Sequence, residues 1–112
     1  MEIIKDKLSG TQLRKMAERF GNMVKAVVDI DQGLIAIDAE LHSDLEALLL
    51  EQGSRPADLW GINFYPELAG DDFVEFDSMI NLRPSRGNRS RGVEDPSVRT
   101  KILEIVQCRI ER

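Results

Sequence analysis

The sequence predicts an α+β fold: a single layer of antiparallel or mixed sheet with four or five strands, and about three helices packed on one face. Two observations predict it. Segments with strand-like apolar patterns occur in neighbouring pairs, which is typical of hairpins rather than of a doubly wound parallel sheet. Amphipathic segments with helix start and stop signals lie between them. We expect the order β-α-β-β-α-β-β-α and one domain over residues 1–112, a length typical of a single domain.

The first half of the chain contains three predicted strands and two predicted helices. A capping box of Ser9 and Gln12 begins the first helix, and Gly21 ends it. A second capping box, Ser43 with Glu46, is expected to begin the second helix. The strands are expected at residues 2–5, 23–30 and 34–39.

The second half contains two predicted strands and a final helix. Apolar and polar residues alternate from Trp60 to Tyr65 and again from Phe73 to Arg83, so each segment is expected to bury one face. Asp95 as N-cap and Pro96 at the first helical position begin the last helix.

Composition and charge exclude several classes of protein. The chain is 42% hydrophobic and 31% charged, as an ordinary folded domain is. Cys108 is the only cysteine, so neither an internal disulfide nor a multi-thiolate zinc site is expected, and we predict no metal and no cofactor. No signal peptide or membrane-length apolar run is evident, so we expect a cytoplasmic protein with no membrane partner.

An arginine-rich loop, residues 83–91, is the most distinctive feature. It carries four positive charges and no acid in a chain of net charge −5, so the rest of the chain carries nine negative charges. Guanidinium groups bind phosphate and carboxylate, so we expect a small anionic ligand at Arg83 and Arg89, with Asn81 and Asn88. The acidic remainder makes general nucleic-acid binding unlikely. In the alternative, the arginines pair with acidic side chains and hold the loop in place.

A polar strand face is the second candidate site. If the strand that ends at Tyr65 pairs with the one that begins at Phe73, Asn63 lies on the same face as Asp77 and Arg83. Amide, carboxylate and guanidinium groups together suit a small polar ligand. The alternatives are a solvated sheet face and a face buried in a homodimer.

His42 is the only histidine, and therefore the one side chain whose unperturbed pKa lies near neutrality. With Asp44 or Asp77 as its carboxylate, it is the candidate catalytic residue of a small hydrolase or transferase. The alternative is a structural histidine just before a helix.

Three groups of residues resemble those of a small uncharacterised prokaryotic family of about this length, a domain of unknown function. They are Glu40-Leu41-His42 with Asp44 and Glu46, then Leu59 to Pro66, then Ser78 to Pro84 with Asn88-Arg89-Ser90. The resemblance covers nearly the whole chain and implies no activity. A Gly-Gly pair often precedes Glu-Leu-His in that family, where this chain has Asp38-Ala39. Family members also often lack an arginine at the position of Arg91, so the resemblance favours Arg83 and Arg89 over Arg86 and Arg91.

The function expected from these features is that of a small binding or regulatory domain for a phosphate- or carboxylate-bearing ligand, with a homodimer as a further expectation. Whether the protein is an enzyme stays open. The alternatives are the hydrolase or transferase that uses His42 and a structural module for protein–protein contacts.

Overall fold

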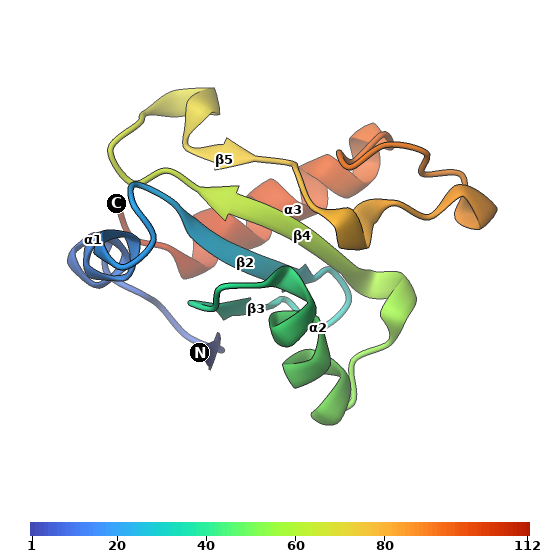
Figure 1. Cartoon of the computed structure of the whole chain (residues 1–112), viewed down its shortest axis with the longest axis horizontal. Helices are drawn as coiled ribbons and strands as arrows, with labels where there is room; N and C mark the ends of the chain where they lie inside the picture. Colours follow the sequence, from blue (N-terminus) through green and yellow to red (C-terminus); the bar gives the residue numbers. More distant parts are fainter.

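The computed structural model describes all residues of the chain, 1–112, and contains three α-helices and a five-stranded antiparallel sheet (Figure 1). The spatial order of the strands is β1-β3-β2-β4-β5, and every neighbouring pair is antiparallel. The α+β class and the order of elements are therefore confirmed. The elements are β1 (Glu2–Ile4), α1 (Gly10–Glu18), β2 (Val24–Asp29), β3 (Leu34–Ile37), α2 (His42–Glu51), β4 (Leu59–Phe64), β5 (Val74–Glu75) and α3 (Pro96–Arg109).

The helices cover both faces of the sheet, so the prediction that they pack on one face was wrong. The larger core cluster joins the sheet to α1 and α3 through residues such as Leu13 and Ile102. A separate cluster packs Leu45 and Leu49 of α2 against the opposite face (Figure 1). All four residues of β3 are buried, as expected for a strand covered on both faces. The continuous apolar run in β3 was the signal of two covered faces.

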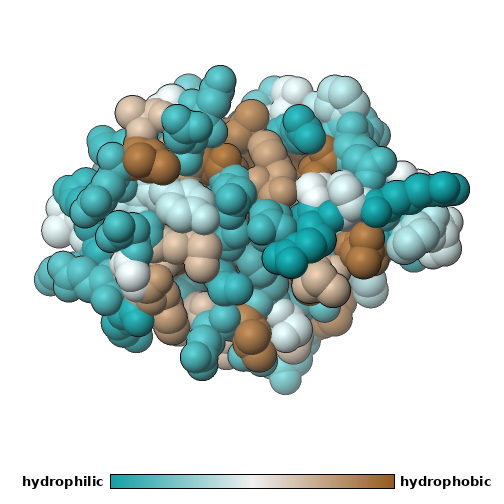
Figure 2. Space-filling view, turned by 45° about the horizontal axis from the view of Figure 1, so that its top comes forward, coloured by the Kyte–Doolittle hydropathy of each residue, from teal (hydrophilic) through white to brown (hydrophobic).

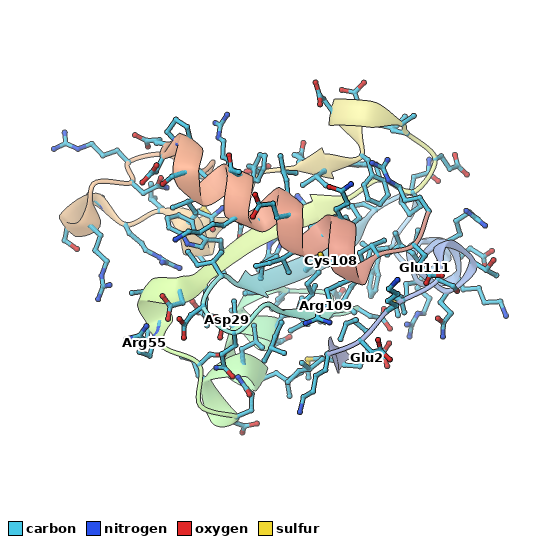
Figure 3. The ribbon with its side chains drawn as sticks, turned by 180° about the vertical axis from the view of Figure 1, so that it is seen from behind. Glu2, Asp29, Arg55, Cys108, Arg109 and Glu111 are labelled. Carbon is cyan, nitrogen blue, oxygen red and sulfur yellow. The ribbon has the colours of Figure 1, made fainter.

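The turn between β2 and β3 is held by the buried carboxylate of Asp29. Its Oδ1 accepts hydrogen bonds from the backbone N–H groups of Asp31 (2.9 Å) and Gln32 (3.0 Å). Its Oδ2 accepts from the hydroxyl of Ser54 at 2.6 Å, which ties the turn to the segment after α2. Arg109 in α3 donates from Nε to the carbonyl of Gly33 at 3.0 Å, on the side drawn in Figure 3. These contacts give every oxygen of the Asp29 side chain a structural partner.

The last strand is shorter than expected. We predicted a strand from Phe73 to Arg83, but β5 ends at Glu75, and residues Met79–Asn81 form a 3₁₀ turn (η3) instead. After the strand ends, Ser78, the N-cap of η3, lies against Gly61 of β4, where an added Cβ would lie 2.5 Å from both side-chain atoms of Ser78. A glycine in β4 is thus what lets this segment lie on the strand.

The helix starts differ in one case from the sequence prediction. Ser9 and Gln12 form the predicted capping box of α1, and Asp95 caps α3 with Pro96 in the first turn. The prediction that Ser43 and Glu46 form a capping box was wrong. Helix α2 begins at His42, and its N-cap is Leu41, which makes no side-chain capping bond. The first backbone N–H groups of α2 therefore lack a side-chain partner.

The surface shown in Figure 2 is mostly hydrophilic, and its hydrophobic side chains lie in small groups between hydrophilic ones. None of the helices combines the length and the apolar character needed to span a membrane.

Candidate functional site

The candidate site is a cavity of about 410 Å³ between the start of α2, strands β4 and β5, and η3. It lies on the face of the sheet that α2 covers, and we call it the His42 cavity. Its volume is within the range typical of small-molecule sites. The ionisable and amide side chains that line it are Lys25, His42, Asn63, Tyr65, Glu75, Asp77 and Arg91.

His42, at the first position of α2, is buried and lines the cavity. Its Nε2 lies 2.8 Å from the carbonyl oxygen of Ile62. Since a carbonyl only accepts, Nε2 carries the hydrogen and donates it, and the neutral ring has its lone pair on Nδ1. Burial lowers the pKa of His42 below 6.5, and the charge of nearby Lys25 lowers it further, although the bond to Ile62 raises it. The ring is therefore neutral at pH 7.

Asn63 is 4% exposed and is oriented by two acceptors. Its Nδ2 donates to Oε1 of Glu75 at 2.9 Å and to the carbonyl of Asp77 at 3.2 Å. The hydroxyl of Tyr65 donates to the same Oε1 at 2.9 Å. Burial and this bond to Glu75 raise the pKa of Tyr65, so the hydroxyl keeps its proton near neutrality. The Oδ1 atom of Asn63 is buried and has no hydrogen-bond donor.

Arg91 and Asp77 form an ion pair at the edge of the cavity, with Nε of the arginine 2.7 Å from Oδ1 of the aspartate. The arginine side chain is 57% exposed, so its other nitrogens are open to solvent or to a ligand. Arg91 is thus the member of the arginine loop that lines this cavity.

Arg83 is held against the sheet instead. Its guanidinium lies 4.6 Å from the ring centroid of Trp60, and it donates to the backbone carbonyls of Ile80 (3.1 Å) and Leu59. Partial burial lowers the pKa of Arg83. This arginine, predicted as the principal ligand-binding residue, makes structural contacts to backbone and to an aromatic ring.

Asn81 and Asn88 also make structural contacts. Asn81 is fully buried and hydrogen-bonds both backbone groups of Gly61. Asn88 donates from Nδ2 to the carbonyls of Asn81 (2.7 Å) and Gly92 (2.8 Å), and accepts from the backbone N–H of Glu94 at 3.0 Å. Two predicted ligand-binding amides thus hold the chain on either side of the loop.

The tip of the loop is exposed. Arg86 and Arg89 are both exposed and pair with no carboxylate side chain. The backbone N–H of Arg89 donates to the carboxylate of Glu94 at 2.7 Å, and this bond is the main cause of the lowered pKa of Glu94. Of the predicted residues, the structure therefore brings Asn63, Asp77 and His42 together, and it keeps Arg83 and Arg89 apart from them.

Sequence reasoning missed three residues of the cavity. Lys25 comes from β2, whose side of the sheet was not predicted to meet His42. The alternation of its strand could have predicted Glu75, because Glu75 shares a face with Asp77. Arg91 was ranked low among the arginines. Asp44, a predicted partner of His42, is exposed and does not line the cavity.

A larger cavity, of about 770 Å³, lies between α3 and β5 and is lined mainly by apolar side chains. Its arginines, Arg99 and Arg112, lie over the rings of Phe76 (5.4 Å) and Phe73 (4.0 Å). It contains no histidine and no buried polar atom without a partner. The His42 cavity is smaller but gathers the groups that recognise a polar ligand.

The antiparallel sheet, the helices on both of its faces and the polar cavity on one face together define a small α+β domain with a candidate ligand site. The chain belongs to the family described as "Protein of unknown function (DUF5674)", whose sequence model matches residues 2–109. This match confirms the resemblance to an uncharacterised family; the prokaryotic distribution stays a prediction. The search of curated proteins and the search of solved structures each found no significant match.

Proposed function

We propose that this protein is a small binding domain for a ligand that bears a carboxylate or a phosphate, and that the ligand binds in the His42 cavity. The observation that carries the proposal is the uncapped start of α2, where Leu41, His42 and Ser43 line a cavity that also receives Lys25 and Arg91. The first N–H groups of a helix and its dipole attract an anion. Two cationic side chains, Lys25 and Arg91, add to that attraction, while the carboxylates of Glu75 and Asp77 in the same cavity and Asp44 in the first turn of α2 oppose it.

The arginine loop contributes to this site through Arg91. The competing location for the anion is the one expected from the sequence, at Arg83 and Arg89 with Asn81 and Asn88. It is supported less well because Arg83, Asn81 and Asn88 are engaged with the backbone. Arg89 stays exposed and available.

The experiment is a titration of ¹⁵N-labelled protein with inorganic phosphate, acetate and methanesulfonate, followed by amide chemical shifts. We expect saturable shifts at Ser43 and Asn63, and at least a fivefold weaker affinity in Arg91→Gln. Arg86→Gln is the matched control, because Arg86 is in the same loop, exposed and distant from the cavity lining. An affinity lost in Arg89→Gln but kept in Arg91→Gln would move the site to the loop tip. Shifts with none of the three anions would contradict the proposal.

A catalytic role for His42 has less support. The carboxylate of Asp77 lines the same cavity, but the hydrogen bond from Nε2 of the ring goes to the carbonyl of Ile62. A hydrolase or transferase needs a general base oriented toward its substrate. The cytoplasmic location, the homodimer and the protein–protein module stay predictions, and light scattering after size-exclusion chromatography tests the second of them.

A further inference from the structure

The His42 cavity contains an acceptor that only a nearby donor can satisfy. Oδ1 of Asn63 is buried without a donor, while Nδ2 of the same amide is held by Glu75 and the carbonyl of Asp77. Those two acceptors fix which end of the amide faces them, so the side chain cannot rotate to exchange its oxygen and nitrogen. An unpaired buried carbonyl oxygen is unfavourable, and this favours any state that supplies a donor.

His42 becomes such a donor when it is protonated. Nε2 already donates to Ile62 in the neutral ring, so an added proton goes to Nδ1. The proximity of the Asn63 side chain acts to raise the pKa of His42, against the effect of burial. His42 and Asn63 line the same cavity, so Nδ1–H of the charged ring would supply the donor that Oδ1 of Asn63 lacks.

The charges around His42 balance in the absence of a ligand. The charged and titratable groups that face it are Lys25 from β2, Tyr65 from β4, Glu75 from β5, and the paired Asp77 and Arg91. Two of these carry a positive charge and two a negative charge, and Tyr65 keeps its proton. A bound monoanion therefore leaves one uncompensated negative charge in a partly buried space, which one proton on His42 would balance.

The two carboxylates of the cavity already have partners. Glu75 accepts hydrogen bonds from Tyr65 and from Asn63 on one oxygen. Asp77 forms an ion pair with Arg91. His42 is the remaining group near the cavity that titrates close to neutrality.

We infer that the cavity takes up its anion together with one proton, which binds Nδ1 of His42 and is donated to Oδ1 of Asn63. The inference rests on the proposed function, because it concerns the same ligand site. The ligand is then an anion, and its affinity increases as the pH falls. The affinity changes by up to tenfold per pH unit between the pKa values of His42 in the free and the bound protein.

The test uses methanesulfonate, which keeps one negative charge throughout the pH range. Its dissociation constant is measured at pH 5.5, 6.5 and 7.5 by amide chemical shifts, and the pKa of His42 is measured from its ring signals with and without the anion. We expect the constant to rise at least fivefold from pH 5.5 to pH 7.5, and the pKa of His42 to rise when methanesulfonate is bound. Arg91→Gln should weaken binding at each pH and keep the pH dependence.

His42→Gln, whose amide can still donate to Ile62, should bind with an affinity that does not depend on pH. If this variant does not fold, the ring titration of the unmodified protein decides the question alone. Binding with equal affinity at the three pH values and an unchanged pKa for His42 would overturn the inference and leave the proposed function standing. Absence of binding at pH 5.5, together with no response to phosphate or acetate, would overturn both.

Discussion

The side chain of Asn81 pairs with the backbone of Gly61 as a neighbouring strand would. The Gly61 N–H donates to Oδ1 at 2.8 Å, and Nδ2 donates back to the Gly61 carbonyl at 2.9 Å. The same Nδ2 donates to the carbonyl of Arg91 at 2.9 Å. One buried amide thus replaces the ladder hydrogen bonds that β5 would have made had it continued, and it joins β4 to the end of the arginine loop.

Asn81→Ala should lower the free energy of unfolding by about 2–4 kcal/mol. The substitution leaves the N–H and C=O of Gly61 without partners in a buried position, and each such group costs about 1–3 kcal/mol. Urea denaturation measures the change. Asn22→Ala is the control, because Asn22 is exposed and should change stability by less than about 0.5 kcal/mol. Equal stability of both variants would show that these hydrogen bonds contribute nothing net.

Gly61→Ala should destabilise the protein by about 2–3 kcal/mol, because the new Cβ would lie 2.5 Å from Cβ and Oγ of Ser78. Gly92→Ala is the control; its Cβ would lie at an ordinary 3.4 Å from the carbonyl of Phe76. Adding Ser78→Gly to Gly61→Ala should recover part of the loss, which a double-mutant cycle by urea denaturation detects. An additive cycle would contradict the steric explanation.

Arg83→Ala should lower stability by about 1–2 kcal/mol through loss of the contact with Trp60 and the bonds to two carbonyls. It should also change the emission of Trp60, the only tryptophan of the chain. Arg86→Ala, at an exposed position of the same loop, should change neither quantity. Arg83→Lys should recover little, since lysine lacks the planar group that stacks on the ring and donates in two directions. A stable Arg83→Ala protein with lost anion binding would instead assign Arg83 to a ligand site.

Asn88→Ala should open the arginine loop to trypsin. Asn88 joins Asn81, Gly92 and Glu94, and Arg86 and Arg89 stand on either side of it as cleavage sites. Losing these bonds should lower the free energy of opening the loop by about 1.4 kcal/mol or more. The population of the open loop and the initial cleavage rate should then rise about tenfold. Mass spectrometry of the early fragments locates the cuts. Cleavage that is no faster than in Asn22→Ala would show that other contacts hold the loop.

The stability of the free protein should fall as the pH drops below 6.5. Burial lowers the pKa of His42 in the folded state, so between that value and 6.5 the unfolded chain binds more protons than the folded chain does. The free energy of unfolding therefore rises with pH across this window, with a slope of up to about 1.4 kcal/mol per pH unit, and the slope vanishes above 6.5 and below the folded pKa. Urea denaturation from pH 5 to pH 8 measures it, and His42→Gln should remove that part of the slope. An unchanged slope in His42→Gln would assign the pH dependence to other groups.

Local sequence signals determined the elements of the fold. The capping box of Ser9, the N-cap Asp95 and the strand from Trp60 to Tyr65 each depend on residues close together in the chain, and each was confirmed. The prediction that this strand buries only one face was wrong, because helices cover both faces of the sheet and all six residues of β4 are buried. The pairing of that strand with the one that begins near Phe73, on which the expected polar face depended, is present in the structure, but its register could not be derived from the sequence.

Tertiary structure alone decided what the polar groups do. Arg83, Asn81 and Asn88 have the composition of an anion site, but their partners are backbone groups and a ring up to 24 residues away in the chain, which no local pattern reveals. The position of α2 on the second face brought His42 next to Asn63 and Lys25. The physical reason is that helix and strand signals arise from neighbours in the chain. Burial, pKa and hydrogen-bond partners depend on packing between elements distant in sequence.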